Sequence, residues 1–171
     1  MTSPTNIYLI GLMGVGKSTI GKKLAHRLGV AFIDCDQELE RRNGVTVNTI
    51  FEIEGESGFR ERETRLLTEL SEKQIGVIAT GGGVVTQADN RLLLKNQAKV
   101  IYLNASVELL WSRLRFCKNR PLLKTDNPKQ KLSELLAVRD PLYQEVASHV
   151  LSVGRGSALS TVKQIEKLLA S

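Results

Sequence analysis

The sequence has few of the residues that build disulfide frameworks, metal centres or membrane spans. Its 171 residues include two cysteines and two histidines. Cys35 and Cys117 lie far apart, outside any C-x-x-C pair. Because His26 and His149 are isolated as well, no structural zinc site is expected. No stretch approaches the ~20 apolar residues of a membrane span, and Met1–Asn6 lacks the basic region of a signal peptide. The composition predicts a cytoplasmic protein with no membrane partner.

Aromatic residues make up 5% of the chain, which argues against the stacking surfaces that bind single-stranded nucleic acids. The net charge of +6 is concentrated between residues 113 and 131, where seven basic residues stand against one acidic residue. These charged residues are Arg113, Arg115, Lys118, Arg120, Lys124, Lys129 and Lys131, with Asp126. One basic segment favours local binding of an anion, with a solvated surface loop as the alternative. No nucleic-acid partner is expected.

Strand and helix patterns alternate along the chain, which predicts one α/β domain with a mostly parallel sheet. The strands are short apolar runs, as expected where helices cover both faces of a sheet. They are predicted at Ile7–Leu12, Ala31–Asp34, Gly76–Ala79, Val100–Leu103 and Val150–Val153. Helices are predicted at Lys17–Leu28, Asp36–Arg42, Val47–Glu54, Gly58–Lys73, Gln87–Asn96, Val107–Phe116, Lys131–Val138, Pro141–Ala147 and Ala158–Ala170.

Two segments interrupt this alternation within the single domain, residues 1–171. Residues 117–128 combine polar and basic residues with two prolines and show no clean periodicity, which is typical of an active-site lid. Residues 36–73 form a long helical insert between the second and third strands. An acceptor-binding subdomain is expected there.

The segment Gly11–Ser18 matches G-x-x-x-x-G-K-[ST] between the first predicted strand and the first predicted helix. In such a loop, glycines let backbone N–H groups approach a polyphosphate at the positive end of the helix. Lys17 is expected to reach the β- and γ-phosphates, and the Ser18 hydroxyl to ligate Mg²⁺. A chance glycine turn is the alternative, but strand, spacing, Lys and Ser agree. The segment predicts binding of a nucleoside triphosphate.

Two carboxylates follow the second strand. Asp34 and Asp36 stand at i and i+2, which on an extended chain points both toward the crevice at the carboxyl ends of the strands. A phosphotransferase needs one carboxylate near Mg²⁺ and another to orient or deprotonate the attacking hydroxyl. Alternatively, Asp36 caps the helix that follows. The third strand ends without an acidic residue, so Asp34 is the best substitute for a metal-binding aspartate there.

An arginine within the insert is a candidate anion ligand. Arg60 and Glu63 lie three residues apart on an apolar helix stripe, so both are expected to face inward. An inward guanidinium is suited to a carboxylate or a phosphate. Glu61, Arg62 and Arg65 are instead expected on an exposed, salt-bridged face.

Three further features point to ligand contacts. The glycines at 81–83 follow the third strand and favour close backbone approach to a ligand, with a plain flexible turn as the alternative. Arg120, next to Pro121, is placed to close over the γ-phosphate as an arginine finger. Arg139 is either a second carboxylate clamp or a surface residue near a proline helix start.

Taken in order and at their spacing, these motifs resemble the shikimate kinase family. They are Gly11–Thr19, Asp34-x-Asp36, Phe59-Arg60, Gly81-Gly82-Gly83, Arg120-Pro121-Leu122-Leu123 and Arg139-x-Pro141-Leu142-Tyr143. The resemblance spans Ile7 to about Arg155. It implies a P-loop NTPase, nucleoside monophosphate kinase-like fold, with three α/β/α layers and a five-stranded parallel sheet of order 2-3-1-4-5. It also implies transfer of the ATP γ-phosphate to the 3-hydroxyl of shikimate, giving shikimate 3-phosphate and ADP in the chorismate route to aromatic amino acids.

The same resemblance implies roles on the acceptor side. Asp36 is expected to bind the acceptor hydroxyls and to act as the base. Arg60 and Arg139 are expected to clamp the shikimate carboxylate. The residues that shape the site are expected to be Gly81, Gly82 and Gly83, and those that carry catalysis Lys17, Asp36 and Arg120.

On the nucleotide side, the resemblance implies ATP and Mg²⁺ as cofactors and a monomeric enzyme. The phosphate-binding residues are expected to be Gly14, Val15, Gly16, Lys17, Ser18 and Thr19, with Arg120 from the lid. Ser18 is expected to hold Mg²⁺ directly and Asp34 through water, while Arg113 stacks near the adenine. Arg155 lies where the family's adenine loop ends, although this segment lacks the acid and the proline of the commoner pattern.

Two other functions fit parts of the sequence. A related kinase for gluconate or a nucleoside monophosphate is one; the pair Arg60 and Arg139 favours a monocarboxylate acceptor, and Asp36 favours a polyol. A nucleotide-dependent switch or an RNA-binding module is the other. The low aromatic content disfavours it, because the basic segment has no interleaved stacking residues.

Overall fold

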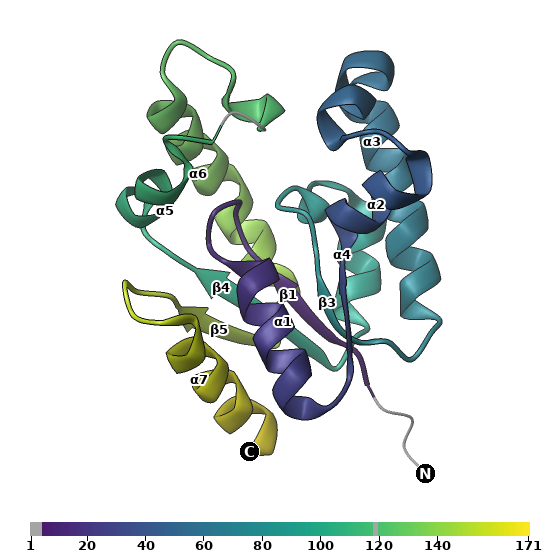
Figure 1. Ribbon diagram of the computed structural model, residues 1–171, viewed down its shortest axis with the longest axis vertical. Helices are drawn as coiled ribbons and strands as arrows, with labels where there is room; N and C mark the ends of the chain where they lie inside the picture. The colour runs from purple at the N-terminus through teal and green to yellow at the C-terminus, as the bar shows by residue number, and fades with distance from the viewer. Residues whose placement is uncertain (1–4, 118–119) are drawn as a thin grey trace.

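Five short parallel strands form the centre of the molecule, in the order β2-β3-β1-β4-β5 (Figure 1). They are β1 (Ile7–Ile10), β2 (Ala31–Asp34), β3 (Gly76–Ala79), β4 (Lys99–Asn104) and β5 (His149–Ser152). The computed structural model describes residues 5–117 and 120–171. Lys118 of the basic segment, residue 119 of the expected lid and the first four residues therefore lie outside the described residues. The predicted fold class and strand order are confirmed.

Helices connect every pair of successive strands in the described chain. They are α1 (Lys17–Leu28), α2 (Cys35–Asn43), α3 (Val47–Ser71), α4 (Ala88–Lys95), α5 (Val107–Leu114), α6 (Pro128–Val146) and α7 (Ala158–Ala170), with 3₁₀ turns η1 (Val84–Thr86) and η2 (Pro121–Leu123). Among the described residues, no helix combines the length and the apolar character needed to cross a membrane.

Helix α3 of the insert is interrupted at Gly55, between the two helices that the sequence predicts. Gly55 has φ 72° and ψ 179° inside α3, between the expected helices 47–54 and 58–73. A positive φ is accessible to glycine because it has no Cβ. The helix α3 therefore consists of two helical parts joined at Gly55.

The prediction of two helices at 131–138 and 141–147 is wrong. Helix α6 begins at Pro128, after the Asn127 side chain accepts a hydrogen bond from the Gln130 N–H at 3.1 Å, and it continues past Pro141. A proline inside a helix removes one hydrogen bond and costs about 3 kcal/mol. Buried residues on both sides of Pro141, including Leu132 and Tyr143, hold the helix against the core. Tertiary packing therefore overrides the local break.

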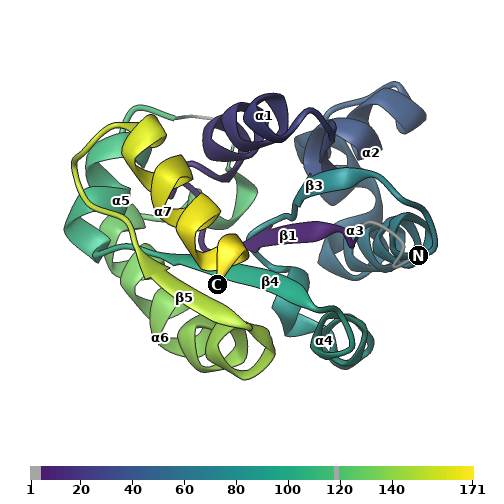
Figure 2. The same cartoon turned by 90° about the horizontal axis from the view of Figure 1, so that it is seen from below.

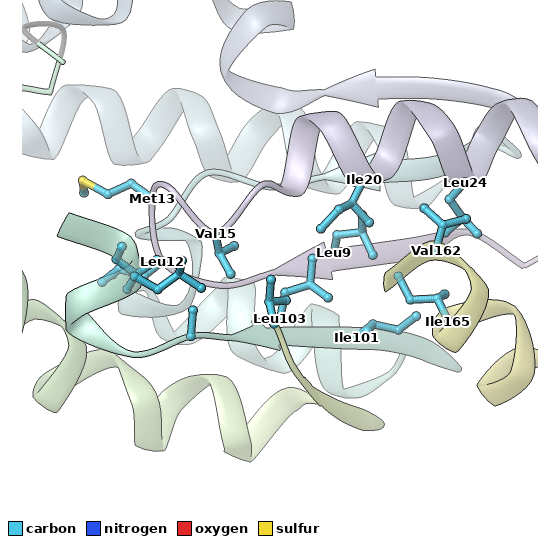
Figure 3. Close-up of a cluster of buried hydrophobic side chains, with 14 of the residues drawn as sticks. Leu9, Leu12, Met13, Val15, Ile20, Leu24, Ile101, Leu103, Val162 and Ile165 are labelled. Atoms are coloured by element: carbon cyan, nitrogen blue, oxygen red, sulfur yellow. The ribbon is translucent and has the colours of Figure 1, made fainter. Parts of the chain in front are cut away.

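The sheet buries side chains on both faces. Helices α1 and α7 lie on one face, and α4 and α6 on the other (Figure 2). Residue alternation in β1 sends Leu9 into the first layer and Tyr8 and Ile10 into the second. In the first layer, Leu9 packs with side chains of α1, β4 and α7 (Figure 3). These are Ile20, Leu24, Ile101, Leu103, Val162 and Ile165.

The helical spacing of Leu159, Val162, Ile165 and Leu169 predicts that this face of α7 packs against the sheet, and in the structure it is only partly buried. Val162 and Ile165 have no exposed surface, and Leu169 packs at the edge of the same cluster. Leu159 is 40% exposed, so its predicted place in the core is wrong. It stands in the first turn of the helix, beyond the two residues that the sheet covers.

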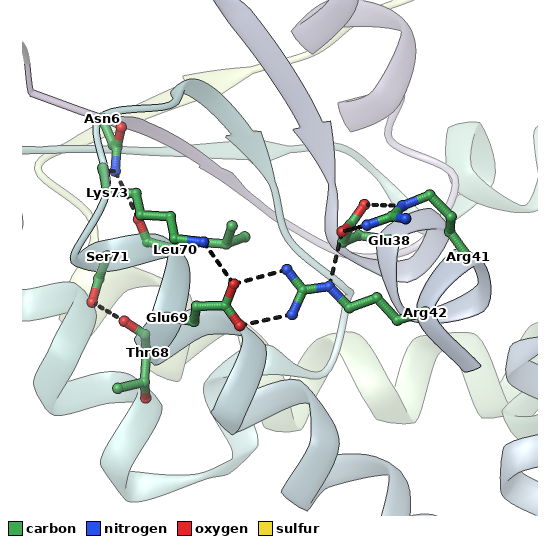
Figure 4. Close-up of polar contacts among 9 residues, drawn as sticks. All are labelled: Asn6, Glu38, Arg41, Arg42, Thr68, Glu69, Leu70, Ser71 and Lys73. Carbon is green, nitrogen blue, oxygen red and sulfur yellow. Dashed lines mark hydrogen bonds and ion pairs between the residues drawn. The ribbon is translucent and has the colours of Figure 1, made fainter.

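The Asn6 side chain forms hydrogen bonds that join the C-terminal end of α3 to the start of β3. Its amide nitrogen donates to the carbonyl oxygens of Leu70 and Lys73 at 3.2 and 2.8 Å (Figure 4). Its amide oxygen accepts from the backbone N–H groups of Ile75 and Gly76 at 2.8 and 3.1 Å. One buried side chain thus satisfies four backbone groups where the insert returns to β3. It fixes the position of α3 against the sheet.

Ion pairs on the surface add contacts within the insert. Arg42 of α2 pairs with Glu69 of α3 at 2.7 Å and with Glu38 at 2.9 Å (Figure 4). Such exposed pairs contribute only tenths of a kcal/mol each. The buried Asn6 contacts therefore matter more for the placement of α3.

Replacing Asn6 by alanine removes four hydrogen bonds to backbone groups, of which the Leu70 carbonyl keeps a second bond from the Lys73 N–H. We expect Asn6→Ala to lower the free energy of unfolding by roughly 2–4 kcal/mol, since each unsatisfied buried group costs about 1 kcal/mol or more. Urea unfolding followed by circular dichroism measures this change. The control is Asn96→Ala, which alters an exposed asparagine at the end of α4. Equal stabilities of the two variants would contradict the role of Asn6.

Candidate active site

The loop between β1 and α1 forms one wall of a cavity of about 390 Å³. Gly14 and Gly16 adopt φ of 86° and 105°, a left-handed conformation that favours glycine. The turn leads straight into the N-terminus of α1, where free N–H groups and the helix dipole attract anions. The residues predicted here that line the cavity are Gly14, Val15, Gly16, Lys17, Ser18, Thr19, Arg113 and Arg120.

Lys17 lies folded against its own loop. Its ammonium group donates to the carbonyl oxygens of Gly11 and Leu12 at 2.6 and 3.2 Å. Burial lowers the pKa of Lys17 to about 8, although the nearby charge of Asp36 opposes the shift. A phosphate in the cavity would favour the charged form of Lys17.

The Ser18 hydroxyl donates to a carboxylate oxygen of Asp34. The other oxygen of Asp34 accepts from the Gln37 N–H at 3.0 Å and so caps α2. The alternative that Asp36 is the cap is therefore wrong. Because Cys35 already begins α2, Asp34 and Asp36 do not stand together on extended chain, and that premise was also wrong. The Asp34 carboxylate thus bonds both to Ser18 of the phosphate loop and to the first turn of α2, and Asp36 takes no part in these two bonds.

A hydroxyl and a carboxylate side by side suit a magnesium ion that takes its other ligands from phosphates and water. Among the described residues, no three His, Cys, Asp or Glu side chains converge to hold a metal by themselves. The pair Ser18 and Asp34 therefore fits a cation that arrives with a nucleotide, and does not form a site for a permanently bound metal.

A second cavity, also about 390 Å³, opens between the insert, the glycine turn and α6. All the acceptor-binding residues predicted from the sequence line it: Asp36, Arg60, Gly81, Gly82, Gly83 and Arg139. Apolar side chains form part of the remaining wall, among them Phe51 and Phe59, whose ring centroids are 4.7 Å apart. The cavity thus combines charged groups with an apolar surface, as a site for a small polar ring compound would.

Two buried guanidinium groups face this second cavity. Arg60 is 6% and Arg139 is 3% exposed. Arg60 pairs with Glu63 at 3.0 Å and with Glu56 at 3.2 Å. Burial lowers the pKa of Arg139, and the neighbouring Arg60 charge acts in the same direction. Within the described structure, Arg60 Nε and Arg139 Nη1 have no hydrogen-bond partner. Two like charges with unused donors suit an anionic group such as a carboxylate.

Glycine at 81–83 lets these charged groups approach the backbone. A Cβ at Gly81 would stand 2.6 Å from Glu63 Oε2 and 2.9 Å from Asp36 Oδ1. A Cβ at Gly83 would overlap the Arg60 guanidinium, and one at Gly82 would stand 3.2 Å from the Met13 nitrogen. The turn is therefore a close approach between backbone and side chains, and the alternative of a merely flexible turn does not account for it.

Two carboxylate oxygens beside the turn have no hydrogen-bond partner within the described residues: Asp36 Oδ1 and Glu63 Oε2. Burial raises the pKa of Asp36, and the negative charge of Asp34 adds to the shift. Burial also raises the pKa of Glu63 to about 7, although Arg60 opposes it. A carboxylate with a raised pKa is better suited to accept a proton near neutral pH.

The helix face of α3 divides as its sequence predicts. Arg60 and Glu63 are buried, and Arg62 and Arg65 lie on the outside. Arg62 pairs with Glu54 at 2.6 Å, and Arg65 with Glu61 at 3.2 Å. The buried charges of this helix line the second cavity, whereas its exposed charges form surface ion pairs.

Four residues line both cavities: Met13, Asp36, Gly82 and Arg120. Arg120 stands at the start of η2, and its Nε has no partner within the described residues. Next to it, Leu123 of the expected lid is 8% exposed and packs into the core. The expected lid is thus anchored near its middle by an apolar side chain.

The two residues expected at the adenine are placed differently. Arg113 lines the first cavity and donates to the carbonyl oxygens of Gly14 and Val15 at 3.2 and 2.9 Å. Arg155 does not line the cavity, whereas its neighbours Gly156 and Ser157 do. The structure therefore brings Gly156 and Ser157 of this segment to the cavity, and not Arg155.

Sequence reasoning missed some of the lining. Met13 and Thr80 line the first cavity, and Met13 also lines the second, but Met13 stands at an unspecified position of the phosphate-loop motif and Thr80 belongs to no motif. Glu63 was expected to face inward, yet its place beside Asp36 depends on the fold of the glycine turn. The spacing of residues along one helix could not show this proximity.

Known proteins match nearly the whole chain. The family model described as shikimate kinase matches residues 13–170. The shikimate kinase of Acinetobacter baylyi is 51% identical over 97% of this chain and 92% of its own length. The solved structure of the Acinetobacter baumannii shikimate kinase in complex with shikimate is 50% identical, with a TM-score of 0.95, over 97% of this chain and 93% of that one.

The chain belongs to the shikimate kinase family. A second solved member, from Bacteroides thetaiotaomicron, is 35% identical with a TM-score of 0.88, over 98% of this chain and 99% of that one. As a member of the family the chain is an ATP-dependent kinase that acts on shikimate, in the biosynthesis of aromatic amino acids. The family assignment thus favours shikimate over gluconate or a nucleoside monophosphate as the acceptor.

The raised pKa of Glu63 predicts a pH dependence of stability. The native carboxyl holds its proton up to a pKa of about 7, while the unfolded carboxyl loses it near 4.5. Because the native state binds more protons between these values, Glu63 makes the free energy of unfolding fall as the pH rises from about 4.5 to 7. We expect Glu63→Gln to remove this contribution, of the order of 2–3 kcal/mol across the interval.

Urea unfolding at several pH values between 4.5 and 7 measures this effect. The control is Glu61→Gln, an exposed carboxylate of the same helix, for which the wild-type slope is expected. If Glu63→Gln keeps the wild-type slope of unfolding free energy against pH, Glu63 does not titrate as described.

Proposed function

We propose that the two cavities hold ATP and shikimate, and that the γ-phosphate passes to the 3-hydroxyl where the cavities meet. The observation that carries this assignment is the set of residues common to both cavities. It places a carboxylate, Asp36, and a guanidinium, Arg120, at the point of contact. An in-line transfer needs an acceptor oxygen and the γ-phosphate next to each other, with charge stabilisation around them.

On the acceptor side, Arg60 and Arg139 bind the shikimate carboxylate. Both residues line the cavity, and each has a buried guanidinium nitrogen without a hydrogen-bond partner among the described residues, which supports this role. The apolar wall covers the ring. The turn at 81–83 sets the distance between the ring and the carboxylates. Asp36 accepts a hydrogen bond from the attacking hydroxyl and takes its proton during transfer.

On the nucleotide side, backbone N–H groups of residues 14–19 hold the phosphates. Lys17 leaves its loop carbonyls to bind the β- and γ-phosphates, and Arg120 neutralises charge on the transferred group. Arg113, fixed to the loop carbonyls, lies beside the adenine. Mg²⁺, when bound with the nucleotide, neutralises phosphate charge. Ser18 and Asp34, which lie side by side, would hold it, Ser18 directly and Asp34 through water.

Further properties follow as part of the same proposal. The chain acts as a monomeric, cytoplasmic enzyme with no nucleic-acid or membrane partner. The single domain 1–171 carries an acceptor-binding insert at about 36–73 and a lid at about 117–128. The two free cysteines support this setting, with Cys35 buried and Cys117 exposed.

Replacing Asp36 by asparagine removes the proposed base but keeps its size. We expect the kcat for shikimate phosphorylation to fall by roughly 10²–10⁴-fold, the range typical of general base catalysis. ADP release with ATP, Mg²⁺ and shikimate measures the rate. The exposed Asp89→Asn is the control. A change in KM alone would show that Asp36 positions the acceptor without accepting its proton.

Replacing Arg60 by lysine keeps the charge but removes the planar donor pair. We expect the KM for shikimate to rise by at least about tenfold while the KM for ATP stays within twofold, since lysine cannot bind a carboxylate in the bidentate way. The matched control is Arg62→Lys on the exposed face of the same helix. An equal rise in both KM values, or no turnover of shikimate by the wild type, would contradict the proposal.

A further inference from the structure

Tyr143 of α6 reaches beneath the glycine turn. Its hydroxyl donates to the carbonyl oxygen of Gly82. The side chain has no exposed surface, and its ring stacks on Tyr102 of β4 with centroids 4.8 Å apart. Tyr143 lines neither cavity, so it does not contact the ligands directly. It acts on the site through the backbone that it holds, and its hydroxyl also lies beside the Arg139 side chain.

The bond from Tyr143 restrains one peptide plane. The Gly82 carbonyl shares a planar trans peptide with the Gly83 N–H, so fixing the direction of one fixes the other. Three successive glycines have more backbone freedom than any other triplet, and side chains cannot restrain them. A partner for the carbonyl is therefore an effective way to hold this plane in one orientation.

The restrained plane lies between the groups proposed to bind shikimate. Gly83 touches the Arg60 guanidinium so closely that a Cβ would overlap it. A Cβ on Gly82 would stand 3.7 Å from Arg139 Nη1. A rotated Gly82–Gly83 peptide would push against one guanidinium or leave space beside the other. The relative position of the two guanidinium groups thus depends on this peptide.

Burial of Tyr143 also favours the protonated hydroxyl, the form that donates to Gly82. Burial raises its pKa, although the nearby charge of Arg139 acts in the opposite direction. Arg139 lies one helical turn before Tyr143, so the two side chains occupy one face of α6. The same helix therefore supplies a carboxylate ligand and the group that fixes the turn opposite to it.

We propose that Tyr143 is a positioning residue for the acceptor: its hydroxyl holds the Gly82–Gly83 peptide so that Arg60 and Arg139 stay aligned for the shikimate carboxylate. This inference rests on the proposed function of the second cavity. It assigns to Tyr143 an effect on shikimate affinity and none on nucleotide affinity.

The test is Tyr143→Phe, which keeps the ring and its stacking and removes the hydroxyl. We expect the KM for shikimate to rise about tenfold, the KM for ATP to stay within twofold, and kcat to change less than the KM for shikimate. Calorimetric binding of shikimate to the same variant should weaken by a similar factor.

Tyr102→Phe is the matched control. Tyr102 is the stacking partner, is equally buried, and donates its hydroxyl to Asp140 at 2.7 Å. We expect Tyr102→Phe to lower the melting temperature about as much as Tyr143→Phe does. The KM for shikimate of Tyr102→Phe should stay within twofold of the wild-type value. This comparison separates positioning from general loss of stability.

Three outcomes overturn the inference: a wild-type KM for shikimate in Tyr143→Phe, an equal rise in Tyr102→Phe, or equal rises in the KM for shikimate and for ATP. Absence of shikimate phosphorylation by the wild type would instead overturn the proposed function. The two failures are therefore distinguishable.

Discussion

Gly81 and Gly83 of the glycine turn cannot carry a side chain without displacing a charged group of the site. A Cβ at Gly81 would press on both Glu63 and Asp36, and one at Gly83 would overlap Arg60. The two cavities meet at this turn because Gly82 also approaches the phosphate loop at Met13. The missing side chains therefore let acceptor-binding residues from the insert and α6 stand next to a phosphate loop on the sheet.

The charges around the turn share one physical feature. Burial lowers the pKa of Lys17 and of Arg139, and it raises the pKa of Asp36 and of Glu63. Each shift means that desolvation works against the charged form, and that the opposite charges nearby compensate only in part. Phosphates beside Lys17 and a carboxylate beside Arg139 would supply the missing compensation. Ligand binding is therefore favoured because the ligand's charges pair with buried groups that have incomplete partners in the free protein.

Local sequence signals located much of the fold and the site. The bounds of α1 and α7 and of β2 and β3 are as predicted. Glycines and capping residues mark where these elements begin and end, and apolar runs mark the strands. The phosphate loop was recognisable because its chemistry requires fixed residues at fixed spacing. The split at Pro141 was wrong, because buried contacts on both sides outweigh the local penalty of a proline. Contacts between distant segments, such as Tyr143 with Gly82 or Glu63 with Asp36, have no signal in local spacing.

The two halves of the site depend on different parts of the fold. The phosphate loop lies between β1 and α1, and it is held by the core beneath it. The acceptor half takes Arg60 from α3 and Arg139 from α6, so it requires those two helices to be correctly placed relative to one another. Asn6 holds the end of α3, and Tyr143 joins α6 to the turn that touches Arg60. Small displacements of α3 therefore change the spacing of the two guanidinium groups while leaving the phosphate loop in place. The geometry of the acceptor half follows from long-range contacts, whereas that of the nucleotide half follows from a local motif.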